Sequence, residues 1–104
     1  MQPKRISHVL SSIENESYRN LVGLAIEQTL LDVGGNKMFY DVLNTLYENY
    51  CSYIQDCCEH PELLLRAIRE QDRKYHNIII ESIVSKLDEF KDRKEIATFL
   101  GALE

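Results

Sequence analysis

The chain contains few residues that end or interrupt helices. Its 104 residues include only four glycines and two prolines. Because glycine and proline most often mark turns, the chain has few places to reverse direction, and we expect long helices. No apolar run approaches the ~18 residues needed to span a bilayer, so no membrane partner is expected. The basic start is followed by a segment at residues 6–13 that is too polar for a signal-peptide core.

Positive charge and cysteine are also limited. The 12 basic and 17 acidic residues give a formal net charge of −5. Nucleic-acid binding usually requires a positive field, so a nucleic acid is not the expected partner. Three cysteines cannot all pair within one chain, and reduced thiols in a cytoplasmic protein are the expected state. The hydrophobic content of 44% indicates one folded domain at this length.

The spacing of apolar residues is helical along most of the chain. It predicts helices over residues 6–13, 17–33, 37–50, 61–72, 75–90 and 92–103. Gly34 is expected to end the second helix in a left-handed conformation, and Pro61 to lie in the first turn of the fourth. We therefore expect an all-α fold, a compact bundle of five to six helices. Residues 1–15 are predicted to form an N-terminal helical extension, and residues 16–104 the helical domain.

The residues best suited to chemistry are concentrated in the connection at residues 51–62. A zinc site is one interpretation, because zinc is held by four sulfur, nitrogen or oxygen ligands, often in closely spaced pairs. The candidate ligands are Cys51, Cys57, Cys58 and His60. A fourth or replacement ligand would come from Asp56, Glu59, His8 or His76. The alternative is that the cysteines are small core residues, which is common for free cysteine.

Cysteine catalysis is not favoured by the same connection. A nucleophilic thiolate needs a nearby base and an oxyanion pocket, and the chain has no glycine-rich turn there. Asp56 and Glu59 would raise the pKa of a neighbouring thiol by repulsion. These carboxylates are instead typical of turns, where they accept hydrogen bonds from backbone N–H groups. We therefore predict no enzymatic activity.

Three arginines recur at helical spacing after this connection. Arg66, Arg69 and Arg73 lie along one helical stripe, and guanidinium groups suit phosphate or carboxylate recognition. The alternative is a solvated face with intrahelical ion pairs, because Glu62 precedes Arg66 by four residues. From residue 38 to residue 65 there are five acidic residues and no Lys or Arg. Such an asymmetric charge distribution suits docking to a charged partner or self-association.

Four of the six tyrosines lie between residues 40 and 53. Tyrosine is common both at core edges and at interfaces. We expect Tyr47 and Tyr50 at the core edge, and Tyr40 and Tyr53 at a contact surface. Gly23 lies inside the most apolar helix, which suggests that another helix approaches closely there.

A homodimer is predicted from two apolar features. The helix at residues 17–33 is apolar over much of its circumference, as is usual for a central helix. A separate apolar stripe precedes it and consists of Ile6, Val9, Leu10 and Ile13.

The chain also resembles a known family. The run from Tyr18 to Gly34 and the motif Tyr53-x-x-Asp56-Cys57-x-x-His60-Pro61-Glu62 are similar to the Nitrosopumilus output domain, over residues 16–103. The resemblance implies a signalling output module in ammonia-oxidising archaea, without catalytic residues that can be transferred. Cys51 and Cys58 do not match that pattern, which weakens a zinc site that needs all three cysteines.

Three functional hypotheses remain. The first is a signalling or regulatory interaction module that binds protein and self-associates. The second is a small metal- or thiol-dependent sensor that uses Cys57, Cys58 and His60. The third is a nucleic-acid regulator that uses the arginine stripe.

Overall fold

The computed structural model describes the backbone of residues 2–71 and 73–103, and the side chains of residues 18–71 and 73–103. Within these ranges the chain forms α-helices and short 3-10 helices and no strand, so the predicted all-α class is confirmed. The elements are α1 (Gln2–Tyr50), η1 (Ile54–Cys58), α2 (Pro61–Gln71), η2 (Arg73–Tyr75), α3 (His76–Leu87), η3 (Asp88–Phe90) and α4 (Lys94–Leu103). The predicted number of five to six helices was wrong, because four α-helices lie within the described ranges.

Helix α1 accounts for the smaller number of helices, because it covers the residues of three predicted helices. It has two legs that meet at Gly35, where φ is 70° and ψ is −165°. Only glycine adopts this combination readily, because a Cβ atom would clash with the backbone. The residue with the unusual conformation is thus Gly35, and the expectation for Gly34 was wrong by one position. No glycine or proline lies between Pro3 and Gly23, so nothing in the sequence ends the helix near residue 15.

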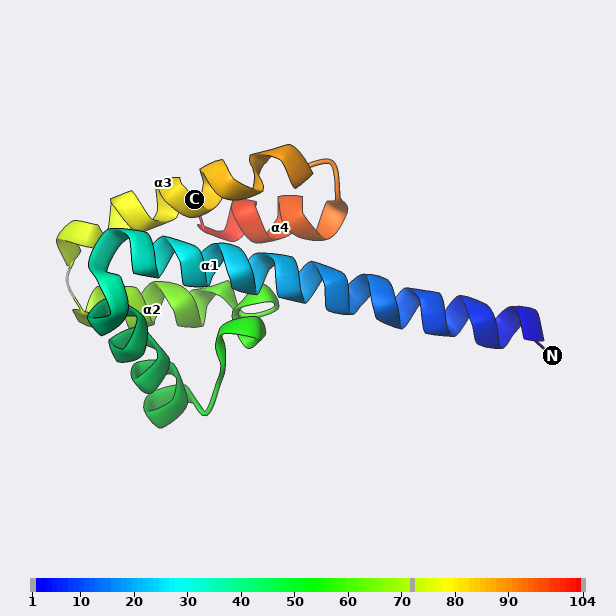
Figure 1. Cartoon of the computed structure of the whole chain (residues 1–104), viewed down its shortest axis with the longest axis horizontal. Helices are drawn as coiled ribbons and strands as arrows, with labels where there is room; N and C mark the ends of the chain where they lie inside the picture. The colour runs from blue at the N-terminus through cyan, green and yellow to red at the C-terminus, as the bar shows by residue number, and fades with distance from the viewer. Residues whose placement is uncertain (1, 72, 104) are drawn as a thin grey trace.

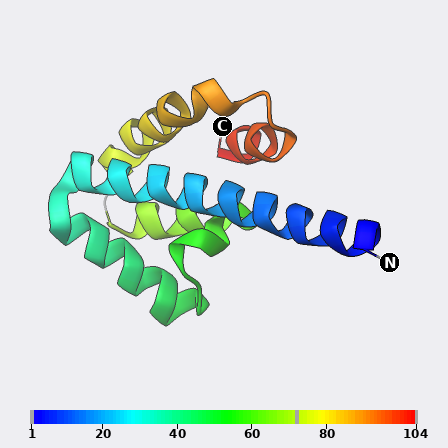
Figure 2. The same cartoon turned by 45° about the vertical axis from the view of Figure 1, so that its right-hand side comes forward.

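The two legs of α1 diverge, and η1 and α2 pack in the angle between them (Figures 1 and 2). The end of α2 is tied to the second leg by Gln71, whose Nε2 donates to Thr45 Oγ1 at 2.8 Å. At the other end of the angle, the Tyr18 hydroxyl of the first leg donates to the carbonyl oxygen of Cys58 at 3.2 Å. The first leg continues beyond the rest of the molecule toward the N-terminus (Figure 1).

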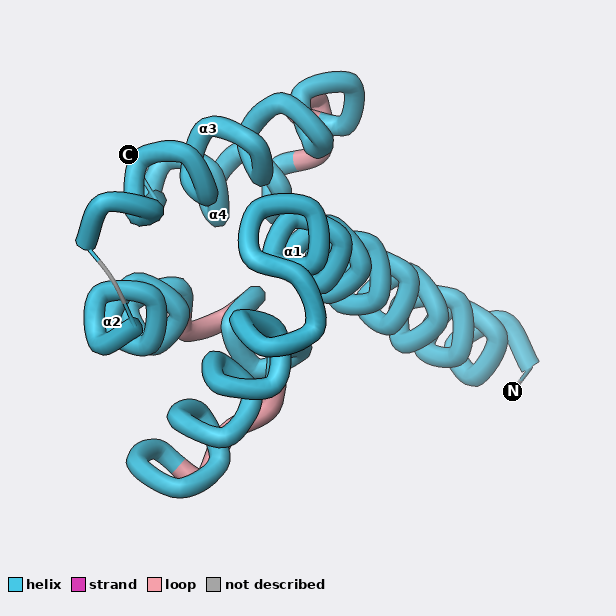
Figure 3. The backbone as a smooth tube through the Cα atoms, turned by 60° about the vertical axis from the view of Figure 1, so that its left-hand side comes forward, coloured by secondary structure: helices cyan, strands magenta, loops and turns pink. Residues whose placement is uncertain are grey.

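Helices α3 and α4 cover the opposite side of the first leg (Figure 3). The fully buried Thr29 hydroxyl lies 3.3 Å from Ser82 Oγ of α3. Lys86 of α3 reaches Asp32 at 3.2 Å, next to the same contact. α1 therefore lies between two groups of helices and contributes to the core on both sides.

The core is apolar and draws on η1 and all four α-helices. Its fully buried large side chains are Val22, Ile26, Leu30, Val42, Leu46, Leu64, Ile68, Ile79, Ile83, Leu87, Ile96 and Phe99. These residues follow the apolar helical spacing of the sequence, and they include Ile79 of the β-branched run at residues 78–80. Among the described residues, no helix is both long enough and apolar enough to cross a membrane.

Two of the three glycines of α1, Gly23 and Gly35, give opposite predictions for stability. An alanine Cβ at position 23 would lie 3.5 Å from Gln55 Cγ, an ordinary contact, so η1 approaches closely but leaves room. Gly23→Ala should therefore raise the free energy of unfolding by up to about 1 kcal/mol, because glycine disfavours a helix interior. Gly35→Ala should lower it by about 1–3 kcal/mol, because alanine is strained at this φ and ψ. Urea denaturation monitored by circular dichroism measures both, and destabilisation by Gly23→Ala equal to that by Gly35→Ala would contradict the assignment.

Candidate functional site

The connection at residues 51–62 forms an ordered turn against α1. The N–H of Tyr53 donates to Asp56 Oδ2 at 2.8 Å, and the N–H of Asp56 donates back to the carbonyl oxygen of Tyr53 at 3.0 Å. The N–H of His60 donates to the carbonyl oxygen of Asp56 at 3.0 Å. The expected structural role of the Asp56 carboxylate in a turn is therefore confirmed.

Arg19 of α1 holds this turn from outside. Its Nη2 lies 3.2 Å from Asp56 Oδ1, and its Nε lies 3.4 Å from Glu59 Oε1. All three side chains are more than one-third exposed, so each pair contributes about 0–1 kcal/mol. The arrangement neutralises two acidic groups of the turn and holds them against α1.

Two of the three cysteines belong to the core. Cys57 is fully buried and Cys58 is 4% exposed. Their Sγ atoms are directed to different carbonyl oxygens, that of Tyr53 at 3.9 Å and that of Arg19 at 3.5 Å. Burial raises the pKa of the Cys57 thiol to about 12 and that of the Cys58 thiol to about 11. Both groups are therefore protonated at neutral pH, which suits core packing and not nucleophilic attack.

The other two candidate ligands, Cys51 and His60, are exposed at the surface. Cys51 is exposed and has a positive φ of 50° at the end of α1. His60 is exposed, with Nδ1 3.5 Å from Glu62 Oε2. Within the described residues, no three His, Cys, Asp or Glu side chains are arranged to hold a metal ion. His8, which was considered as a further ligand, lies outside the described side chains.

Thiol accessibility tests this arrangement. A disulfide reagent such as dithiobis(nitrobenzoate) should modify one thiol rapidly in the folded protein, because only Cys51 among the three cysteines is exposed. Cys57 and Cys58 should react only on unfolding, since burial disfavours their thiolates. The variant Cys51→Ser should therefore show no rapid phase. Rapid modification of two or three thiols in the folded wild type would contradict the buried positions.

An open groove lies between the two legs of α1, next to the same turn. The groove has a volume of about 420 Å³. Its lining residues are Asn20, Gly23, Leu24, Glu27, Phe39, Leu43, Tyr53, Ile54 and Gln55. Leu24 is 50% exposed and Tyr53 is 62% exposed, so the groove presents apolar and aromatic surface to solvent. Sequence reasoning placed Tyr53 at a contact surface but missed the groove. The available signal was Leu24, an apolar residue set apart from the main stripe of its helix.

The other tyrosines extend this surface along the second leg. Tyr40 is exposed, and its ring centroid is 5.5 Å from that of Phe39. Tyr47 is also 55% exposed, so its expected position at the core edge was wrong. Its ring lies 5.9 Å from that of Tyr53, because the chain turns back at Cys51 and brings the two rings together at the surface. Tyr50, by contrast, packs partly buried against the core as expected.

The arginine stripe is exposed on α2 and η2. Among the described residues, Arg66, Arg69 and Arg73 have no ion-pair partner. The alternative pair between Glu62 and Arg66 is not formed, because the Glu62 carboxylate lies against His60. Arg69 and Arg73 instead line a polar hollow together with His76 and Asn77, two residues that sequence reasoning did not connect with the stripe.

Comparison with known proteins adds no relative. No family model, no curated protein and no solved structure matches the chain at a significant level. The resemblance to the Nitrosopumilus output domain family stays a prediction.

Proposed function

We propose that the chain is a non-enzymatic regulatory interaction module that acts as a homodimer. In the proposed dimer, the projecting part of α1 from one copy lies antiparallel on the first leg of α1 in the other copy and covers the groove. The observation that carries this proposal is the half-exposed Leu24 at the edge of an open groove, on the same helix that extends beyond the molecule.

The proposed pairing has a two-fold axis near residue 17 of α1. Because a helix rises about 1.5 Å per residue, the two antiparallel copies then remain in contact over several turns. Position 10 then lies opposite Leu24, and the apolar stripe of Ile6, Val9, Leu10 and Ile13 runs along the groove. Because the axis is two-fold, the same contact forms twice.

The charges at the two surfaces are complementary. Glu27 lies at the groove and has no ion-pair partner among the described residues. Beyond Lys37, which pairs with Asp41, the second leg and the following turn belong to the segment of residues 38–65 that lacks Lys and Arg. The incoming helix carries Arg5 at the flank of its apolar stripe, and in the proposed register Arg5 lies within one turn of the position opposite Glu27. Such complementarity favours one orientation of the two copies.

The resemblance to an output-domain family supports a signalling role, and the burial of the Cys57 and Cys58 thiols supports a non-catalytic one. Dimerisation would then be the event through which the module acts. The exposed Tyr40 and Tyr47 lie beside the groove on the second leg and remain available for a further protein partner.

Sedimentation equilibrium tests the dimer. The wild-type chain should have twice the monomer mass at tens of micromolar. Leu24→Glu should raise the dissociation constant at least about tenfold, because burying a leucine contributes about 1.5–3 kcal/mol and the contact occurs twice. Ile78→Glu on α3 is the matched control, since Ile78 is 52% exposed but lies away from the groove, and it should leave the mass unchanged.

A charge exchange tests the register. Glu27→Lys should weaken the dimer, and adding Arg5→Glu should restore it in part. A monomeric wild type, or equal weakening by Leu24→Glu and Ile78→Glu, would contradict the proposal.

A further inference from the structure

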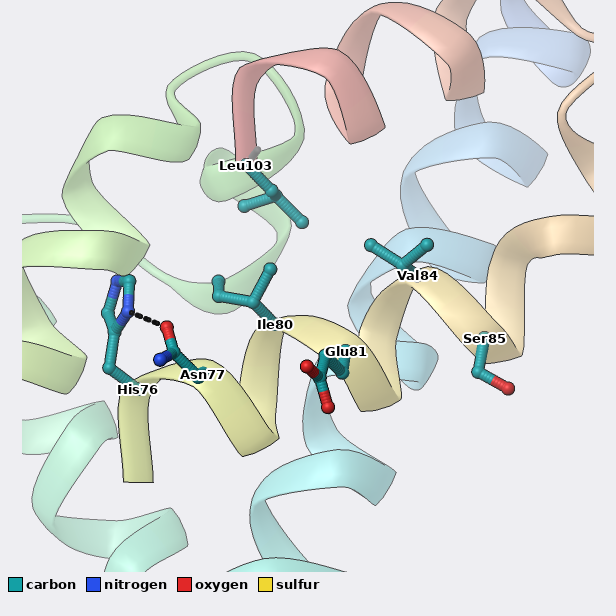
Figure 4. A pocket seen from close by; sticks show the side chains of 7 residues that line it. All are labelled: His76, Asn77, Ile80, Glu81, Val84, Ser85 and Leu103. Atoms are coloured by element: carbon teal, nitrogen blue, oxygen red, sulfur yellow. Dashed lines mark hydrogen bonds between the residues drawn. The ribbon is translucent and has the colours of Figure 1, made fainter. Parts of the chain in front are cut away.

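A second surface feature lies at the turn between α2 and α3. Its first part is the polar hollow of about 320 Å³ lined by Arg69, Arg73, His76 and Asn77. His76 and Asn77 also line a neighbouring hollow of about 460 Å³, which continues along α3 to the end of α4 (Figure 4). The two hollows therefore adjoin at His76 and Asn77, and we treat them together as one pocket with two chemically different ends.

The first end carries the positive charge of two arginines that have no ion-pair partner in the part of the chain that the structure describes. Neither Arg69 nor Arg73 forms an ion pair with any residue that the structure describes. The Nε2 atom of His76 is enclosed and has no hydrogen-bond partner within the described part of the chain, while Nδ1 lies 3.4 Å from Asn77 Oδ1. His76 also begins the twelve-residue helix α3, whose N-terminus has a positive partial charge. These groups together favour an anionic ligand group at this end.

The second end is largely apolar. Ile80 and Val84 of α3 and Leu103 of α4 border the same space (Figure 4). Ile80 is 9% exposed and Leu103 is 5% exposed, so most of their surface is already packed and their positions are fixed. The volume lies in the range of small-molecule sites, which are about 300–1,000 Å³. Glu81 also lines this end, and its carboxylate would repel a second anionic group there.

We propose that this pocket binds a small monocarboxylate with an apolar arm. The carboxylate would lie between Arg69 and Arg73, where planar guanidinium groups can donate paired hydrogen bonds. The arm would cover Ile80, Val84 and Leu103 in place of water. The proposed dimer uses none of the residues that line this pocket, so the pocket is a separate site.

Isothermal titration calorimetry of the full chain with octanoate tests the pocket. Octanoate should bind measurably at millimolar concentration, and acetate and octanol should bind at least about tenfold more weakly, because each lacks one of the two groups. Arg73→Gln should weaken octanoate binding by about tenfold or more, since hydrogen bonds to charged groups are strong. Arg66→Gln is the matched control, because it removes the same charge from the same stripe outside the pocket, and it should leave binding unchanged.

Chemical-shift mapping of the wild type provides an independent measurement if a variant fails to fold. Octanoate should shift the signals of the His76 ring and the Leu103 methyl groups. The proposal would be overturned by no octanoate binding, by equal losses in Arg73→Gln and Arg66→Gln, or by shifts confined to other residues. Tighter binding of octyl phosphate than of octanoate would overturn the assignment to a carboxylate.

Discussion

The backbone conformation of Gly35 is the constraint on which the rest of the fold depends. Its φ of 70° separates α1 into two diverging legs, and a residue with a Cβ atom would be strained there. The angle between the legs is the space that η1 and α2 occupy (Figure 2). A straight α1 would separate Thr45 from Gln71 and expose the apolar faces that meet in this angle. The same turn creates the groove, because Leu24 and Phe39 come from opposite legs.

The angle between the two legs of α1 also determines the role of the cysteines in the turn at η1. Cys57 and Cys58 face the core within the angle of α1, where burial raises the pKa of both thiols. Arg19 neutralises the neighbouring carboxylates from outside. The most reactive residue types in the chain thus serve to attach a connection to the long helix, and the open surfaces lie beside this motif and at the α2–α3 turn.

Helical periodicity was sufficient to predict the all-α class and the buried faces, because each apolar stripe depends only on local spacing. It could not predict that α1 is continuous near residue 15, or which of two adjacent glycines, Gly34 or Gly35, turns the chain, since the long-range packing determines this. The candidate sites were less predictable. The spacing of Arg69 and Arg73 indicated a shared face, but the contribution of His76 depends on how α3 follows α2. Tyr47 and Tyr53 meet at the surface only because the chain turns back at Cys51.

The central functional claim is that α1 of one copy covers the groove of another, and isotope-filtered nuclear Overhauser spectroscopy tests it most directly. In a sample that mixes labelled and unlabelled chains, the account predicts intermolecular contacts between the methyl groups of Val9 or Leu10 and those of Leu24, and also with the Tyr53 ring. Intermolecular contacts that involve Ile78 instead, or none at all at concentrations where the chain is dimeric, would contradict it.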